Sequence, residues 1–244
     1  MRPAATTNAS TINRTSLTGA AVAVAALAYP AAAAADGAIA GTVTIEGSAP
    51  EREAVSMDQD PVCAQGEPQL SEAIVAEGDK LKDVYVRVTD GSISGDHSPP
   101  SEPVAIDQED CMYRPRVAGA MPGQTLRIGN SDRTLHNVHG YAGGNTRFNL
   151  GQPPKGPDIE REVGGSAGVL ELRCDVHPWM RAYIVVSEHP HFDVTGTDGT
   201  FAITGVPAGT HTVEAWHPEL GRARAEVEVS AGERAEADMS LSAD

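Results

Sequence analysis

The chain has 244 residues, of which 34 are acidic and 18 basic, so its formal net charge is −16. This charge disfavours binding to nucleic acid and to anionic lipid surfaces and would steer a basic partner at low salt, although solubility alone also explains it. Glycine (25) and proline (17) are frequent, aromatic residues make up 4%, and no stretch keeps a helical period. We therefore expect an all-β fold of short strands and many turns.

The N-terminal stretch has the features of a secretory signal. Residues 1–35 carry Arg2 and Arg14 as their only charges, followed by a small apolar run and a row of alanines. We predict a signal peptide over residues 1–35, since the run is too short and too rich in alanine for a membrane span. An uncleaved anchor is the alternative. The remaining chain has 16 basic and 34 acidic residues, and we expect it to be secreted, periplasmic and not inserted in the membrane.

Alternating apolar residues and turn signals predict the strands in chain order. Polar, Pro-rich residues 47–72 form a loop, residues 91–103 a boundary and residues 140–157 a long loop. The predicted strands cover residues 38–45, 82–89, 104–117, 124–129, 169–172, 183–186, 200–203, 212–216, 224–229 and 235–241.

One short loop carries three types of metal ligand. Cys174, His177 and Met180 lie between two strand-like runs, and His136 lies upstream in a His-Asn-Val stretch. Thiolate and thioether suit copper, and trigonal His₂Cys with a weak axial Met is typical of electron-transfer copper sites.

These residues resemble the cupredoxins, the small blue copper proteins, over residues 102–187. The loop is most similar to the amicyanin-type pattern Cys-x-x-His-Pro-x-Met, and Leu135 stands where many relatives carry proline. The resemblance implies one copper ion held by His136, Cys174, His177 and axial Met180, with Asn137 hydrogen-bonded across to the cysteine loop. It also implies that His177 is the electron port, with Pro178 and Trp179 as the docking patch. From its place in the ligand loop we expect Trp179 to shield the metal from water, and an electron-exit role is the alternative.

The two ends of the chain resemble a second family. Thr197-Asp198-Gly199-Thr200-Phe201, followed by a Pro-x-Gly-x-x-x-Val stretch at 207–213, is similar to the carboxypeptidase regulatory-like domain, a transthyretin-type β-sandwich. Residues 41–45 and 83–88 fit the first strands of that family. The resemblance implies that residues 37–90 and 190–244 form one sandwich, interrupted by the copper domain.

The other cysteines and histidines leave alternatives. In an oxidising compartment we expect a disulfide between Cys63 and Cys111; the alternative places Cys111 in a second metal site with nearby acids. His139 lies three residues beyond His136 and so faces the other side of a regular strand, which indicates packing rather than ligation. The pair His189 and His191 forms either an interdomain polar cluster or a secondary metal site, and His97 lies in a solvated linker.

Several enzyme classes lack their motifs here. Arg173 and Asp175 flank Cys174, so the His-Cys-His core of multicopper oxidases is missing, and a single loop cysteine does not fit a binuclear copper centre. No haem-attachment, triad or His-Glu-x-x-His motif stands out, so we do not expect an enzyme.

The sequence favours a type 1 copper protein that carries single electrons between redox partners, such as a basic cytochrome or a dehydrogenase. The alternatives are a copper-binding or delivery protein, a cupredoxin-shaped sandwich that holds zinc or binds metal poorly, and a secreted carbohydrate- or protein-binding module with a vestigial metal site.

Overall fold

A computed structural model describes residues 1, 4, 35–89, 93 and 95–243. The chain divides into two units, Met1–Ala33 and Ala34–Asp244, and the described strands all belong to the second unit. The predicted signal peptide lies, apart from residues 1, 4 and 35, outside the described residues. Among the residues described, no helix has the length and apolar character needed to cross a bilayer. The all-β prediction is confirmed, since the described chain is built from strands and one short 3₁₀ helix, η1 (Cys63–Gln65).

Strands from both ends of the chain share two sheets. The strands are β1 (Gly37–Glu46), β2 (Ala76–Glu77), β3 (Lys80–Leu81), β4 (Tyr85–Val88), β14 (Phe192–Val194), β15 (Thr200–Val206), β16 (Gly209–His217), β17 (Gly221–Val229), β18 (Arg234–Glu236) and β19 (Met239–Ser242). In one sheet β1 pairs antiparallel with β15 and β3 and parallel with β18 and β19, while β2 pairs with β3. In the other, the order is β14-β4-β16-β17.

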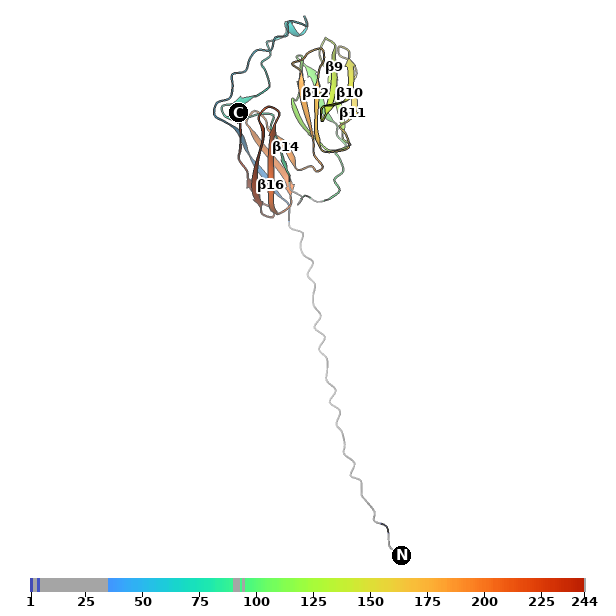
Figure 1. Cartoon of the computed structure of the whole chain (residues 1–244), viewed down its shortest axis with the longest axis vertical. Helices are drawn as coiled ribbons and strands as arrows, with labels where there is room; N and C mark the ends of the chain where they lie inside the picture. Colours follow the sequence, from blue (N-terminus) through green and yellow to red (C-terminus); the bar gives the residue numbers. More distant parts are fainter. Residues whose placement is uncertain (2–3, 5–34, 90–92, 94, 244) are drawn as a thin grey trace. The chain divides into compact units, whose positions relative to one another are not determined.

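The middle of the chain forms two further sheets. Their strands are β5 (Val104–Glu109), β6 (Met112–Arg114), β7 (Val117–Ala120), β8 (Thr125–Asn130), β9 (His136–Ala142), β10 (Asn145–Gln152), β11 (Ile159–Glu162), β12 (Gly168–Arg173) and β13 (Arg181–Val186). One sheet has the order β10-β9-β12-β13-β7, and β10, β9 and β12 can be followed side by side in Figure 1. The other has the order β11-β8-β5-β6.

Each pair of sheets encloses its own apolar cluster. Ile39 and Val43 of β1 face the same side of the strand, because alternate residues of a strand share a face. Both pack in one cluster with Val86 of β4. Leu172 and Ile184 belong to the cluster of the middle sheets, which also contains Cys174 and Met180. These pairings are the ones that an inserted middle domain requires; the domain boundaries themselves stay a prediction.

The prediction of a long loop at residues 140–157 is wrong. β9 and β10 form a hairpin there, with Ala142 paired to Asn145 across a two-residue turn. The turn residues Gly143 and Gly144 have φ of +57° and +79°, which a tight hairpin turn of this kind needs and glycine adopts without strain. The glycines thus marked a hairpin rather than an irregular loop. The predicted strand at 104–117 is likewise divided, into β5, β6 and the start of β7.

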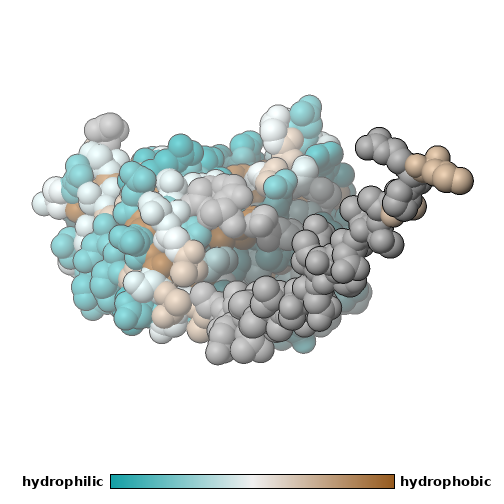
Figure 2. All heavy atoms as spheres, turned by 90° about the horizontal axis from the view of Figure 1, so that it is seen from below, coloured by the Kyte–Doolittle hydropathy of each residue, from teal (hydrophilic) through white to brown (hydrophobic). Residues whose placement is uncertain are grey.

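The surface agrees with the acidic composition. On the face that Figure 2 shows, hydrophilic residues predominate and hydrophobic areas are small and scattered. Four large hydrophobic side chains between residues 35 and 243 stand out as exposed: Val62, Leu70, Leu135 and Val176.

Candidate metal centre

The backbone around the ligand loop continues the β12–β13 ladder. Arg173 pairs with Arg181 at the end of the ladder, and the N–H of Cys174 donates to the carbonyl of Met180 at 3.3 Å. The N–H of Met180 in turn donates to the carbonyl of His177 at 2.9 Å, which closes a tight turn. His136 begins the neighbouring strand β9, and β9 pairs with β12. The sheet register therefore brings the loop and His136 to the same end of the sandwich.

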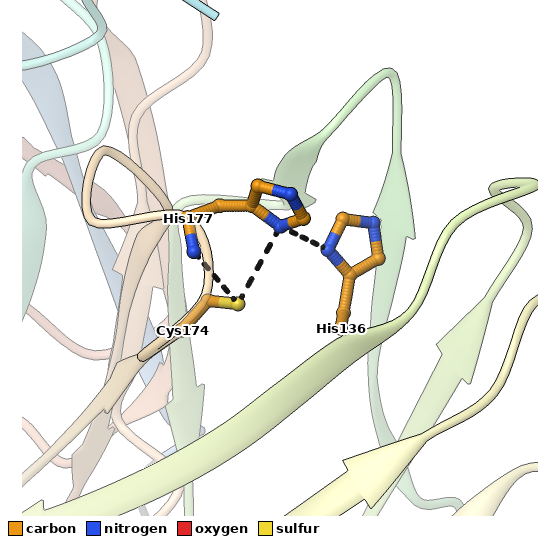
Figure 3. A group of neighbouring side chains, drawn as sticks. All are labelled: His136, Cys174 and His177. Carbon is orange, nitrogen blue, oxygen red and sulfur yellow. Dashed lines mark hydrogen bonds between the residues drawn. The ribbon is translucent and has the colours of Figure 1, made fainter. Parts of the chain in front are cut away.

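Three of the four predicted ligands converge. The rings of His136 and His177 and the sulfur of Cys174 point toward one another (Figure 3), and their donor atoms all lie within 4.8 Å of one another. His136 Nδ1 is 2.8 Å from His177 Nδ1, and Cys174 Sγ is 3.7 Å from His177 Nδ1. His136 is 0% exposed, Cys174 2% and His177 1%. Met180, 0% exposed, lies in the same apolar cluster as Cys174.

Both imidazoles are held by carboxylates on their outer edge. Nε2–H of His136 donates to Asp132 Oδ2 at 2.8 Å, and Nε2–H of His177 donates to Asp60 Oδ2 at 3.1 Å. An ionised carboxylate only accepts hydrogen bonds, so both Nε2 atoms carry hydrogen, and in the neutral form of each ring the lone pair is on Nδ1. This tautomer is the one that outer-shell carboxylates impose on metal-bound histidines.

The Nδ1 atoms of His136 and His177 face each other, so either a proton or a metal ion lies between them. Two nitrogens that bind one ion at about 2.0 Å each lie about 3.3 Å apart at a tetrahedral angle, about half an ångström more than the 2.8 Å between the two Nδ1 atoms here. The third donor is a soft sulfur on the same side. Two imidazole nitrogens and one thiolate are donors that suit copper and also zinc.

The electrostatics of the metal-free centre agree with this. Burial by itself would raise the pKa of the Cys174 thiol, but hydrogen bonds from His136 and His177 outweigh it and lower the pKa to about 6. Burial would also lower the pKa of His136, but its bonds to Asp132 and Cys174 raise the pKa to about 9. At neutral pH the centre thus holds a thiolate beside an imidazolium, and a metal ion can replace that proton.

Asn137 makes the bond that the resemblance implied. Its Oδ1 accepts the N–H of Asp175 at 2.7 Å and lies 3.4 Å from Cys174 Sγ. His139 is outside the converging group: its Nδ1 is 3.0 Å from Asp175 Oδ2 and 2.8 Å from the hydroxyl of Tyr141. It is a packing and hydrogen-bonding residue of β9.

Cys63 and Cys111 form a disulfide, with Cα atoms 5.7 Å apart. Cys111 is therefore not free to hold a second metal ion. Two further groups of potential ligands, Asp60–Cys63–His177 and Cys111–Asp132–His136, each contain one of these bridged cysteines. Each group also contains His177 or His136, so both lie at the outer edge of the Cys174 centre and are not separate sites.

The expected docking residues differ in exposure. Pro178 is exposed, whereas Trp179 is half-buried, with its Nε1–H bonded to the Cys111 carbonyl at 2.9 Å and its ring centroid 5.1 Å from that of His177. The outer edge of His177 faces Asp60 instead of solvent.

The sequence did not single out Asp60 or Asp132. Asp132 precedes His136 by four residues, a local spacing that could have been noticed. Asp60 is separated from His177 by 117 residues, and nothing in the acidic loop around it distinguishes its carboxylate.

Three other histidines cluster without converging. The ring centroids of His97, His189 and His191 lie 5.5–6.4 Å apart. Within the described chain, their donor atoms do not come within 4.8 Å of one another as those of the Cys174 group do. The geometry favours a packed polar cluster over a second metal site.

Similarity to known proteins is found at the level of structure alone. No protein family model matches the chain, and no curated protein sequence matches it. A purple cupredoxin from Nitrosopumilus maritimus is similar at 21% identity, covering 34% of this chain and 99% of that one, with a TM-score of 0.29. An amicyanin from Paracoccus versutus covers 42% of this chain and 97% of its own at 20% identity and a TM-score of 0.31. A Cu-containing nitrite reductase from Thermus scotoductus covers 41% of this chain and 25% of its own at 18% identity and a TM-score of 0.31.

Proposed function

We propose that the chain binds one copper ion through His136, Cys174 and His177, with Met180 as a weak axial ligand, and carries single electrons between redox proteins. The observation that carries the proposal is the convergence of two Nδ1 atoms and one thiolate sulfur in a buried site whose outer nitrogens are held by carboxylates. When bound, the ion supplies a one-electron Cu(II)/Cu(I) couple.

The residues of the chain contribute rigidity and exclusion of water. The loop is tied at Cys174 and Met180, and Asn137 joins it to β9. Donors that cannot move far suit an ion that changes charge without changing ligands. Their burial also argues against a delivery protein, which needs its ion to exchange readily.

Docking and export belong to the same proposal. Leu135 and Val176, 49% and 44% exposed, directly precede His136 and His177. With Pro178 they offer an apolar contact for a redox partner, and the net charge of −16 favours a basic one. The disulfide supports export to an oxidising compartment. We propose an electron carrier and not an enzyme.

A titration of the metal-free protein with Cu(II), followed by visible absorption, tests the proposal. We expect one equivalent of copper to produce an intense thiolate-to-copper band that a reductant bleaches and that Cys174→Ser abolishes. A parallel titration with Zn(II) separates the two metals, because zinc gives no such band. A protein that binds no stoichiometric copper would contradict the electron-carrier function and favour the secreted binding module.

A further inference from the structure

The outer edge of His177 is covered by a loop that comes from the other sandwich. Residues 53–71 leave the sheet after β1 and return before β2. The loop is closed at its base, where Ser71 N–H donates to the Glu53 carbonyl at 2.7 Å and Val55 N–H donates to the Gln69 carbonyl at 2.8 Å. The two arms of the loop are therefore paired at its base, where Ala54 bridges Leu70.

The tip is fastened to the sandwich that holds the candidate ligands. The disulfide links Cys63 to Cys111, and Met57 and Met112 pack around it in one buried cluster that Trp179 also contacts. A long acidic loop is thus held in one place beside the centre.

Asp60 lies at this tip, and both of its carboxylate oxygens are occupied. Oδ2 accepts from Nε2–H of His177 at 3.1 Å and from the hydroxyl of Thr134 at 2.6 Å. Oδ1 accepts the N–H groups of Val62 at 2.7 Å and Cys63 at 3.3 Å. The Asp60 side chain is only 15% exposed. One carboxylate thus joins the loop, the segment before His136 and the ring of His177.

We propose that Asp60 is a positioning residue of the copper centre, which keeps the hydrogen of His177 on Nε2 so that Nδ1 faces the metal, and whose charge favours Cu(II) over Cu(I). This inference rests on the proposed function. A negative charge close to a metal and shielded from water stabilises the more highly charged oxidation state, and carboxylate partners raise the basicity of a ligating imidazole. Asp132 acts on His136 in the same sense, so the centre carries an anion behind each imidazole.

Asp60→Asn tests the inference, with Asp58→Asn as the matched control. An asparagine side chain has one oxygen and one NH₂ group, so it cannot accept hydrogen bonds on both sides as the carboxylate does. Asp58 lies on the same loop, is exposed and bonds Ser56 at 3.2 Å, so its replacement removes the same charge without touching His177. Far-UV circular dichroism and a thiol count check that both variants are folded with the disulfide intact.

The first readout is copper affinity in both oxidation states, measured by competition with chelators. We expect Asp60→Asn to weaken Cu(II) binding about tenfold or more and Cu(I) binding less, because loss of an outer-shell partner typically costs that much. A tenfold change in the ratio of the two affinities raises a one-electron reduction potential by about 59 mV. Asp58→Asn should match the wild type. Equal effects of the two variants would overturn the inference.

The second readout needs no copper and separates this inference from the proposed function. In the metal-free protein, NMR of ¹⁵N-labelled histidine should show a slowly exchanging Nε2–H on His177 in the wild type and in Asp58→Asn, lost in Asp60→Asn. If the wild type binds no copper, the proposed function fails while this signal still decides whether Asp60 orients His177. A signal unchanged in Asp60→Asn would contradict the positioning role.

Discussion

Asn137 joins the two segments that hold the candidate ligands, and its replacement tests how much this bond stabilises the fold. It is 8% exposed and accepts the Asp175 N–H. Asn137→Ala leaves that donor without its partner, so we expect the free energy of unfolding to fall by about 1–3 kcal/mol. Urea denaturation of the metal-free wild type and of the variant measures this difference in the free energy of unfolding. Asn149, whose side-chain amide donates to the Asp175 carboxylate at 2.8 Å from an exposed position, is the control and should cost clearly less when changed to alanine. Equal losses would contradict a special role for the Asn137 bond.

His217 gives the fold a pH dependence far from the metal centre. Burial and the nearby Arg116 lower its pKa from 6.5 to about 4, and its Nδ1 accepts the N–H of Glu219 at 3.2 Å. As the pH falls, His217 is therefore protonated near pH 6.5 in the unfolded chain but only near pH 4 in the folded protein. The stabilising contribution is full above pH 6.5 and is lost as the pH falls toward 4.

We expect up to about 3 kcal/mol of pH-dependent stability from this residue. Denaturation curves at several pH values compare the wild type with His217→Asn, whose side-chain oxygen keeps an acceptor near Nδ1 but does not titrate. The variant should show a flatter dependence between pH 6.5 and 4. An unchanged slope would show that His217 is not responsible.

At the scale of elements, the β9–β10 hairpin depends on its glycine turn. Gly144 has φ of +79°, and a side chain there meets no atom within 4 Å, so only backbone strain opposes a substitution. We expect Gly144→Ala to destabilise the protein by about 1 kcal/mol. Gly151 in β10 lacks a positive φ and is equally open, so Gly151→Ala should be neutral or stabilising. Thermal unfolding of both variants checks this, and a loss common to both would argue against turn strain.

The residue patterns show how far the sequence leads. Alternation at Val86 and Val88 predicted β4, and ligand chemistry in one loop predicted that Cys174 and His177 lie together, because both signals are local. The β9–β10 hairpin was missed because its glycines were interpreted by composition rather than as a turn. Asp60 was missed because its contact with His177 spans 117 residues and depends on a loop fastened by a distant disulfide.

At the scale of the whole chain, the strand pairing predicts that the two ends stay together without their covalent link. β1 pairs with β15, and β4 with β16, so residues 37–90 and 190–244 share two sheets. We expect these fragments to remain associated after proteolysis near Gly95 and Glu188. The disulfide would hold residues 37–94 to the middle fragment, so the experiment uses Cys63→Ser/Cys111→Ser.

Loss of the disulfide should itself lower stability by about 4 kcal/mol in the chain-entropy model for a separation of 48 residues. The double variant must therefore be tested at a temperature where circular dichroism shows it folded. Fragments that separate on gel filtration under those conditions would contradict the nested arrangement.

In the proposed centre, one copper ion is held by the sulfur of Cys174 and two imidazole nitrogens. X-ray absorption at the copper edge of protein loaded with one equivalent of Cu(II) tests it most directly. We predict one sulfur and two nitrogens at short distance, with the sulfur absent in Cys174→Ser. An inner sphere of nitrogen and oxygen alone in the wild type would contradict it.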